Sequence, residues 1–207
     1  MKQKLLTILF ALCAMAMTIS PTQTVKAAPK STYKSILAAY KKNDYKKVNK
    51  LSKKLPANAN EKCVKKMKSK YKKAAKKIVK KIGFYNGGEK SAILFYAYSD
   101  INKDAIPELI IKYGRSEQGS KLHIYEYKSG KYKKVKGSTD AWHVGIYNYT
   151  SGNGLVLKDG STTDRVYERV RLVTLKKGKM TTKLIRKRVF DDLNQRVTLP
   201  CAIKTYY

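Results

Sequence analysis

Residues 91–114 read SAILFYAYSDINKDAIPELIIKYG, and this stretch decides the fold. An aromatic, strand-like run over residues 93–98 enters a short acidic loop, and a second strand-like run over residues 109–113 leaves it. Short apolar runs that are bounded by turn residues are typical of buried strands. We therefore predict two neighbouring core strands that are joined by the loop 100–108.

The loop carries oxygen-bearing side chains at alternate positions. Relative positions 1, 3, 5 and 9 are occupied by Asp100, Asn102, Asp104 and Glu108. Position 7 usually offers a backbone carbonyl, which here belongs to Ile106. This spacing is typical of an oxygen shell around calcium. The sequence thus predicts a metal site in which calcium is the cofactor and these five residues are its ligands.

Two features of the sequence disfavour calcium binding by this loop. Position 6 usually needs a positive φ, which costs a residue other than glycine about 1 kcal/mol, and Ala105 stands there. The formal net charge of +32 also disfavours a divalent cation. A metal-free turn is the alternative, because Asp and Asn side chains often hydrogen-bond the backbone of their own turn.

Residues 1–27 have the three parts of a signal peptide. Lys2 and Lys4 form a charged start, residues 5–19 are apolar, and small residues surround the cleavage position after Ala27. The apolar run is shorter than the roughly 20 residues of a spanning helix. We expect export and a secreted or cell-surface mature chain without a transmembrane segment, with a retained membrane anchor as the alternative.

Residues 28–83 are predicted to form a lysine-rich helical segment. Apolar residues recur at helical spacing in three runs, the last of which extends from about residue 60 to Ile82 and ends at Gly83. We expect its apolar stripe to contact the core rather than to form a binding groove. Residues 31–82 contain 19 lysines, no arginine and two acidic residues.

Residues 84–207 are predicted to form an antiparallel β domain, because from Ala92 onward the apolar residues recur with the period of two that is typical of strands. Ser129-Gly130, residues 151–154 and Lys177-Gly178 are hairpin signals between alternating runs. We predict about eight or nine strands in an antiparallel β-meander. The fold class is therefore α+β, with the N-terminal lysine-rich helices packed on this meander and residues 28–207 as one folding unit.

The segment DINKDAIPELII resembles the calcium loops of FG-GAP and EF-hand-like proteins. The chain is similar to small exported proteins of Gram-positive bacteria in which a Tyr-rich helical start precedes such a strand–loop–strand unit and a β-meander follows. The opening STYKSILAAYKK and the later KLHIYEYKSGKYKKV fit this pattern. The resemblance implies the same five ligands, with Lys103 pointing to solvent. That family is largely of unknown function, so the resemblance implies a fold and an ion rather than an activity.

The exposed lysines predict a strong positive field that attracts anionic wall polymers, acidic lipid headgroups or acidic glycans. A solvated face without a ligand is the alternative, since lysine is a good helix former. We expect no specific nucleic-acid binding, because the lysines have no interleaved aromatic ladder on which bases could stack.

The sequence shows no enzyme signature. His123 and His143 are expected to be ordinary strand residues. Four carboxylates leave a glycan hydrolase as a distant alternative, and they are Glu126, Asp159, Asp164 and Glu168. Cys63 and Cys201 permit one disulfide or two free thiols. The expected function is a non-enzymatic, calcium-stabilised binding module, and a polycationic adhesin with a metal-free loop is the alternative.

Overall fold

The computed structural model describes residues 31–57, 61–88, 90–161, 167–189 and 197–207. The predicted signal peptide and Asp164 lie outside these residues, and so does the Cys63 side chain. Four helices come first in the described chain: α1 (Ser31–Lys41), α2 (Tyr45–Ser52), α3 (Glu61–Lys66) and α4 (Ser69–Ile82). All strands follow them, so the predicted α+β order is confirmed.

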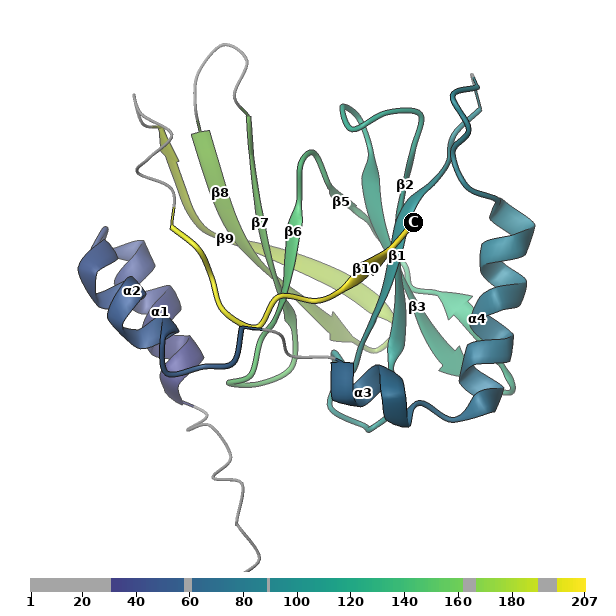
Figure 1. Ribbon diagram of the computed structural model, residues 1–207, viewed down its shortest axis with the longest axis horizontal. Helices are drawn as coiled ribbons and strands as arrows, with labels where there is room; N and C mark the ends of the chain where they lie inside the picture. The colour runs from purple at the N-terminus through teal and green to yellow at the C-terminus, as the bar shows by residue number, and fades with distance from the viewer. Residues whose placement is uncertain (1–30, 58–60, 89, 162–166, 190–196) are drawn as a thin grey trace, which may run out of the picture.

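The strands are antiparallel and fall into two sheets (Figure 1). They are β1 (Ala92–Ser99), β2 (Glu108–Gly114), β3 (Lys121–Lys128), β4 (Lys131–Lys134), β5 (Thr139–Asp140), β6 (Gly145–Asn148), β7 (Leu155–Ser161), β8 (Tyr167–Lys176), β9 (Lys179–Val189) and β10 (Thr205–Tyr206). The first sheet has the order β10-β1-β2-β3-β4, with β5 also paired to β3, and the second has the order β6-β7-β8-β9. The strands are thus divided between two sheets rather than joined in one meander.

The chain changes sheet at residues 141–144. Ala141 is buried, and His143 has a φ of 42°, which an extended strand does not allow. Strand β6 therefore starts only at Gly145. This break lets β6 begin a new sheet instead of extending the first one.

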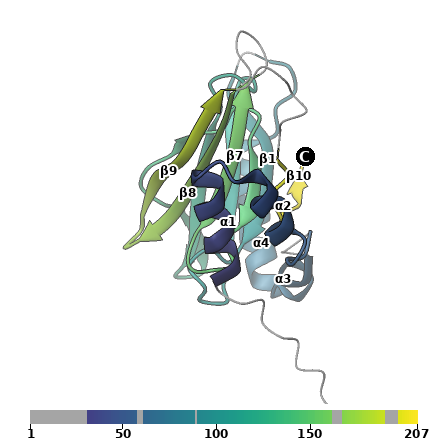
Figure 2. The same cartoon turned by 90° about the vertical axis from the view of Figure 1, so that its left-hand side faces the viewer.

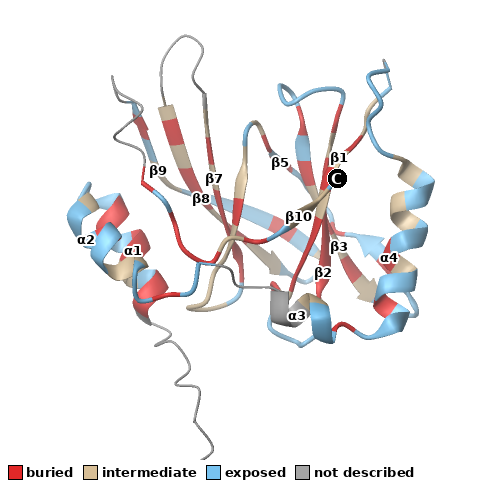
Figure 3. Ribbon diagram, in the orientation of Figure 1, coloured by how far each residue is buried: buried red, intermediate tan, exposed pale blue. Residues whose placement is uncertain are grey.

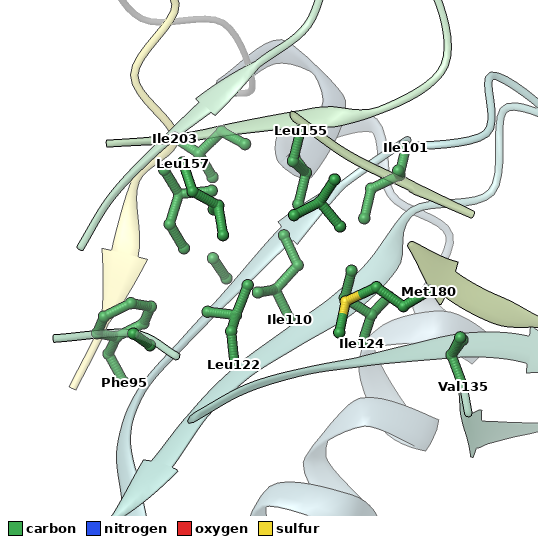
Figure 4. Close-up of a cluster of buried hydrophobic side chains, with 14 residues drawn as sticks. Phe95, Ile101, Ile110, Leu122, Ile124, Val135, Leu155, Leu157, Met180 and Ile203 are labelled. Atoms are coloured by element: carbon green, nitrogen blue, oxygen red, sulfur yellow. The ribbon is translucent and has the colours of Figure 1, made fainter. Parts of the chain in front are cut away.

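The two sheets pack face to face around an apolar core (Figure 4). Phe95 and Ile110 enter it from the first sheet, and Leu155 and Leu157 enter it from the second. On β2, Ile110 faces this core while Leu109 and Ile111 face the opposite side. Burial of both faces explains why β2 reads as a continuous apolar run rather than as an alternating one.

Helices cover the two outer faces of this sandwich. Helices α1 and α2 lie over the second sheet, where Tyr33 and Ile36 join a cluster with Val156 (Figure 2). Helix α4 lies on the other side of the molecule, and Tyr71 and Ala75 pack with residues of the first sheet. The prediction that the last helical stripe contacts the core is confirmed for these two residues. None of the helices in the described part of the chain has the length and hydropathy of a membrane crossing.

The last predicted helix is broken in two. Helix α3 ends at Lys66, and Lys68 has the extended backbone angles φ −58° and ψ 143° before α4 begins. Met67 lies at the break and is buried. At the other end, Gly83 takes a φ of 79° and its N–H bonds to the carbonyl of Val79, so the predicted C-terminal cap is confirmed.

The final residues connect the layers. Residues 197–207 contain the two-residue strand β10 and a bridge between Ala202 and Tyr147. Cys201 is buried, and burial raises the pKa of its thiol to about 11. Because the Cys63 side chain is not described, the choice between a disulfide and two thiols stays open.

Candidate calcium-binding loop

The loop joins two adjacent strands at the centre of the first sheet. Ser99 and Glu108 are directly paired where β1 ends and β2 begins. Ile101 is fully buried between the two sheets, and the Tyr132 hydroxyl donates a hydrogen bond of 2.7 Å to the carbonyl of Pro107. The loop is therefore anchored at both ends, and its shape is set by the surrounding core.

The backbone of the loop contains two left-handed residues. Lys103 has a φ of 65°, and Ala105 has a φ of 66°. Ala105 occupies position 6, where a calcium loop needs this conformation. The alanine therefore adopts the required turn despite the cost of its Cβ, and the objection raised by the sequence does not prevent the loop geometry.

The two carboxylate oxygens of Asp100 have different surroundings. Its Oδ2 accepts a hydrogen bond of 3.2 Å from the Ala105 N–H, which closes the turn. Its Oδ1 is buried and has no hydrogen-bond partner among the described residues. A buried carboxylate oxygen without a partner is costly, and a bound cation would satisfy it.

Asn102 and Asp104 fold over the backbone of the loop. Asn102 Oδ1 accepts a bond of 3.1 Å from the Asp104 N–H, and Asp104 Oδ1 accepts one of 2.8 Å from the Ile106 N–H. The Asn102 amide also donates to Asp104 Oδ2 at 3.0 Å. These are the contacts of the metal-free turn, yet each oxygen keeps a second lone pair for a ligand.

Glu108 is the most buried of the predicted ligands, with 2% of its surface exposed. Its Oε2 accepts a bond of 2.6 Å from the Ile101 N–H. The pKa of this carboxyl is raised to about 8, chiefly by desolvation; the Ile101 hydrogen bond opposes the rise, and the nearby charges of Asp104 and Asp100 add to it. The charges of Asp100 and Asp104 therefore disfavour the ionised form of Glu108, and a divalent cation would relieve that repulsion.

Lys103 does not simply point to solvent, as the resemblance implied. Its ammonium donates to the Asp100 carbonyl at 2.7 Å and to Asn148 Oδ1 on β6 at 3.0 Å. The reason is that the loop lies beside the second sheet, which offers an acceptor. Lys103 thus ties the loop to β6 and adds a positive charge near it.

The five predicted ligands belong to one loop, but they do not form a closed metal shell. Over the described ranges, no three Asp, Glu, His or Cys side chains converge closely enough to hold a metal ion. Calcium binding would therefore require the three loop carboxylates to move closer together, with the Asn102 amide oxygen and the Ile106 carbonyl as further ligands. The donor set, all oxygen with three carboxylates, suits calcium.

A second group of charges, which the sequence did not predict as a unit, lies in the second sheet. Asp159 accepts from Arg169 Nε at 2.9 Å and pairs with Arg171 on β8. Glu168 pairs with Lys158 at 2.7 Å and accepts a bond from the Tyr40 hydroxyl. The sequence signal that could have predicted these ion pairs is the placement of opposite charges on neighbouring strands, as with Asp159 and Arg169.

Asp159 and Glu168 were two of the carboxylates of the hydrolase alternative. Asp159 pairs with Arg169 across β7 and β8, while Glu168 stands next along β8, so their side chains project from opposite faces of the sheet. Both border a cavity of about 340 Å³ at the sheet edge. Each carboxylate already neutralises basic side chains, and this arrangement favours a structural ion-pair role.

The two histidines differ from the expectation of ordinary strand residues. His123 lies in β3, but its Nδ1 is buried and has no hydrogen-bond partner among the described atoms. Burial lowers its pKa to about 4, helped by Lys134 and Lys121. His123 is therefore neutral near pH 7. His143 lies in a turn, where its Nδ1 is 3.7 Å from a Glu117 oxygen.

The lysines of residues 31–82 cover the outer surfaces of the helices. Every one of them whose side chain is described is exposed (Figure 3). None of the ion pairs formed within the described ranges includes one of these lysines. They therefore form a positive surface that is not neutralised from within the described chain.

Comparison with protein-family models, with curated proteins and with solved structures finds no match.

Proposed function

We propose that this protein is an exported, non-enzymatic binding module whose loop 100–108 holds one structural calcium ion. One observation carries the calcium assignment: Asp100 Oδ1 is buried without a hydrogen-bond partner in the described structure, in a loop whose sixth residue already has a φ of 66°. Buried Glu108 supports it, because its carboxylate lies near the charges of two other predicted ligands.

The ion would act on the centre of the first sheet. Its ligands would be the oxygens of Asp100, Asn102, Asp104, Ile106 and Glu108. Bound calcium supplies two positive charges, which offset the repulsion among the three carboxylates. Because the loop joins β1 to β2, calcium would stiffen the pair of strands that both apolar cores share.

The test is thermal unfolding of the purified protein in chelator and in millimolar calcium. With about 10 mM calcium, an extracellular site whose Kd is about 10⁻⁴ M stabilises the folded state by about 2.7 kcal/mol. Calcium should therefore raise Tm, and Asp100→Asn or Asp104→Asn should abolish the rise.

Asp44→Asn is the matched control. Asp44 is an exposed helix cap whose side chain accepts from the Lys47 N–H, outside the loop. This variant should keep the full calcium response. An unchanged Tm for the wild-type protein would overturn the calcium assignment and leave the metal-free turn.

The lysine surface supports a second candidate, adhesion to anionic polymers. The supporting observation is that the described lysines of residues 31–82 are exposed and outside the ion pairs of the described chain. Such binding depends on counterion release, so it should weaken steeply with salt. Retention on an immobilised polyanion that did not change with salt would count against it.

Export is the third part of the proposal. Cleavage after Ala27 would remove the charged start and the apolar run. The secreted protein should begin at Ala28, and N-terminal sequencing of protein from the medium or the cell surface would test this. Recovery of the chain with Lys2 and the apolar run intact would contradict it.

A further inference from the structure

A groove lies between the last turns of α4 and strand β1 of the first sheet. Its volume is about 380 Å³, within the range of small-ligand sites. Lys76 and Lys80 border it on the helix, one turn apart. Phe84 and the β1 residues Tyr96 and Tyr98 supply the aromatic lining of the groove. The apolar part of the groove is therefore aromatic and the helical rim is basic.

The aromatic rings of the groove form one connected group. Tyr96 stacks on Tyr206 of β10, with ring centroids 5.2 Å apart and an angle of 21° between the planes. Phe84 lies 6.0 Å from Tyr96 at 46°, and it is 41% exposed. Exposure of a large ring beside other rings is unusual for a residue with only a packing role.

The charges around the groove have one sign. Lys76 and Lys80 are exposed and take no part in the ion pairs of the described chain, and no acidic residue is among the described residues that line the groove. Lys204 lies on the far side of the ring group, with its ammonium 6.0 Å from the centre of Tyr206. An occupant should therefore combine a flat apolar face with negative charge.

We propose that this groove binds an acidic polysaccharide. The apolar face of one pyranose ring would rest on Phe84 and Tyr96, and carboxylates of the polysaccharide would contact Lys76 and Lys80. The inference rests on the proposed function as a binding module, and it names the class of ligand and the site. A single-stranded nucleic acid fits less well, because successive bases need successive stacking surfaces and this groove offers one compact ring group.

The test measures binding of a hyaluronate hexasaccharide to the full protein by calorimetry. Lys76→Gln/Lys80→Gln should weaken binding roughly tenfold or more. The control is Lys77→Gln/Lys81→Gln, which removes two exposed lysines at the same spacing on the same helix but outside the groove. It should change affinity by about twofold at most, since rim charges away from a ligand contribute little.

The aromatic part is tested with a second pair of variants. Phe84→Ala should weaken hyaluronate binding roughly tenfold, since it removes the exposed ring. Tyr85→Ala removes a neighbouring ring of similar exposure, 38%, that does not line the groove, and it should leave binding unchanged. Unchanged far-UV circular dichroism and Tm would show that each variant folds.

Four results would overturn the proposal. They are no binding of hyaluronate, equal losses in both lysine pairs, equal binding of neutral maltohexaose, and tighter Phe84-dependent binding of an oligothymidylate. The Tm response of the same samples to calcium tests the loop separately. Groove-dependent binding without a calcium response would contradict the metal site alone, and the reverse result would contradict the groove alone.

Discussion

Ala105 holds a left-handed conformation that glycine adopts without strain. Ala105→Gly removes about 1–2 kcal/mol of strain and adds about 0.4–1 kcal/mol of unfolded-state entropy, so it should stabilise the fold by a few tenths to about 1 kcal/mol. Urea denaturation would measure the change. Ala57→Gly is the control, since Ala57 is exposed and has no positive φ. It should destabilise, and a loss of stability from Ala105→Gly would contradict the strain argument.

Glu108 should make the stability of the metal-free protein depend on pH. Burial raises its pKa from 4.5 to about 8, so between these values the folded state binds a proton that the unfolded state has lost. The stability that this group contributes is therefore present below pH 4.5 and is lost as pH rises through about 8. The free energy of unfolding of the wild type minus that of Glu108→Gln, measured in chelator by urea denaturation, should therefore fall as pH rises.

If the difference in unfolding free energy between wild type and Glu108→Gln stayed constant from pH 5 to 8.5, the raised pKa of the buried carboxyl would be contradicted. Calcium should reverse the trend, because it binds the ionised carboxylate and releases the proton. Calcium affinity should therefore increase with pH through the same range, and a pH-independent affinity would show that Glu108 is not a ligand.

At the residue scale, the positions of the candidate ligands could be predicted because a calcium loop is defined by local spacing. The orphaned Asp100 Oδ1 and the Lys103 contact with Asn148 could not. The Lys103 contact depends on the second sheet, whose Asn148 on β6 lies 45 residues further along the chain. A local pattern cannot show which distant strand will cover a loop.

The ion pairs of the second sheet give a prediction at the scale of elements. Asp159 is 3% exposed and pairs with Arg169 and Arg171 across β7 and β8. Asp159→Asn would leave buried Arg171 without its carboxylate, at a cost of about 3–5 kcal/mol. Asp140→Asn removes an exposed carboxylate near the same arginine and should cost less than about 1 kcal/mol. Similar losses in urea denaturation would contradict this ranking.

Element identity could largely be predicted, while element boundaries and sheet membership could not. The periods of 3.6 and 2 placed the helices before the strands, and Gly83 marked a helix end. The break at Met67–Lys68 has no Gly or Pro to signal it. The change of sheet at His143 depends on a strained turn, for which the residue type gives no local warning.

At the scale of the whole molecule, four layers are stacked as helices, sheet, sheet and helices. Three apolar clusters hold them together, and the described lysines of residues 31–82 lie on the outside. The described helices therefore place many positive charges on the surface of a chain whose formal net charge is +32. Self-repulsion should be strong at low ionic strength.

Salt should stabilise the protein as a whole. Raising the ionic strength from about 10 mM to about 150 mM shortens the screening length from about 30 Å to about 8 Å, which weakens repulsion among the lysines. Tm in chelator should therefore rise with sodium chloride. Lys77→Gln/Lys81→Gln should show a smaller rise, because two exposed charges are removed. A Tm that fell with salt would show that attractive pairs dominate the surface.

The central claim is that loop 100–108 binds one calcium ion, and equilibrium dialysis of the purified protein against calcium tests it most directly. We predict one ion per chain with a Kd at or below about 10⁻³ M. Binding should be lost in Asp100→Asn and retained in Asp44→Asn. Absence of saturable binding, or equal binding by both variants, would contradict the account and leave the loop as a metal-free turn.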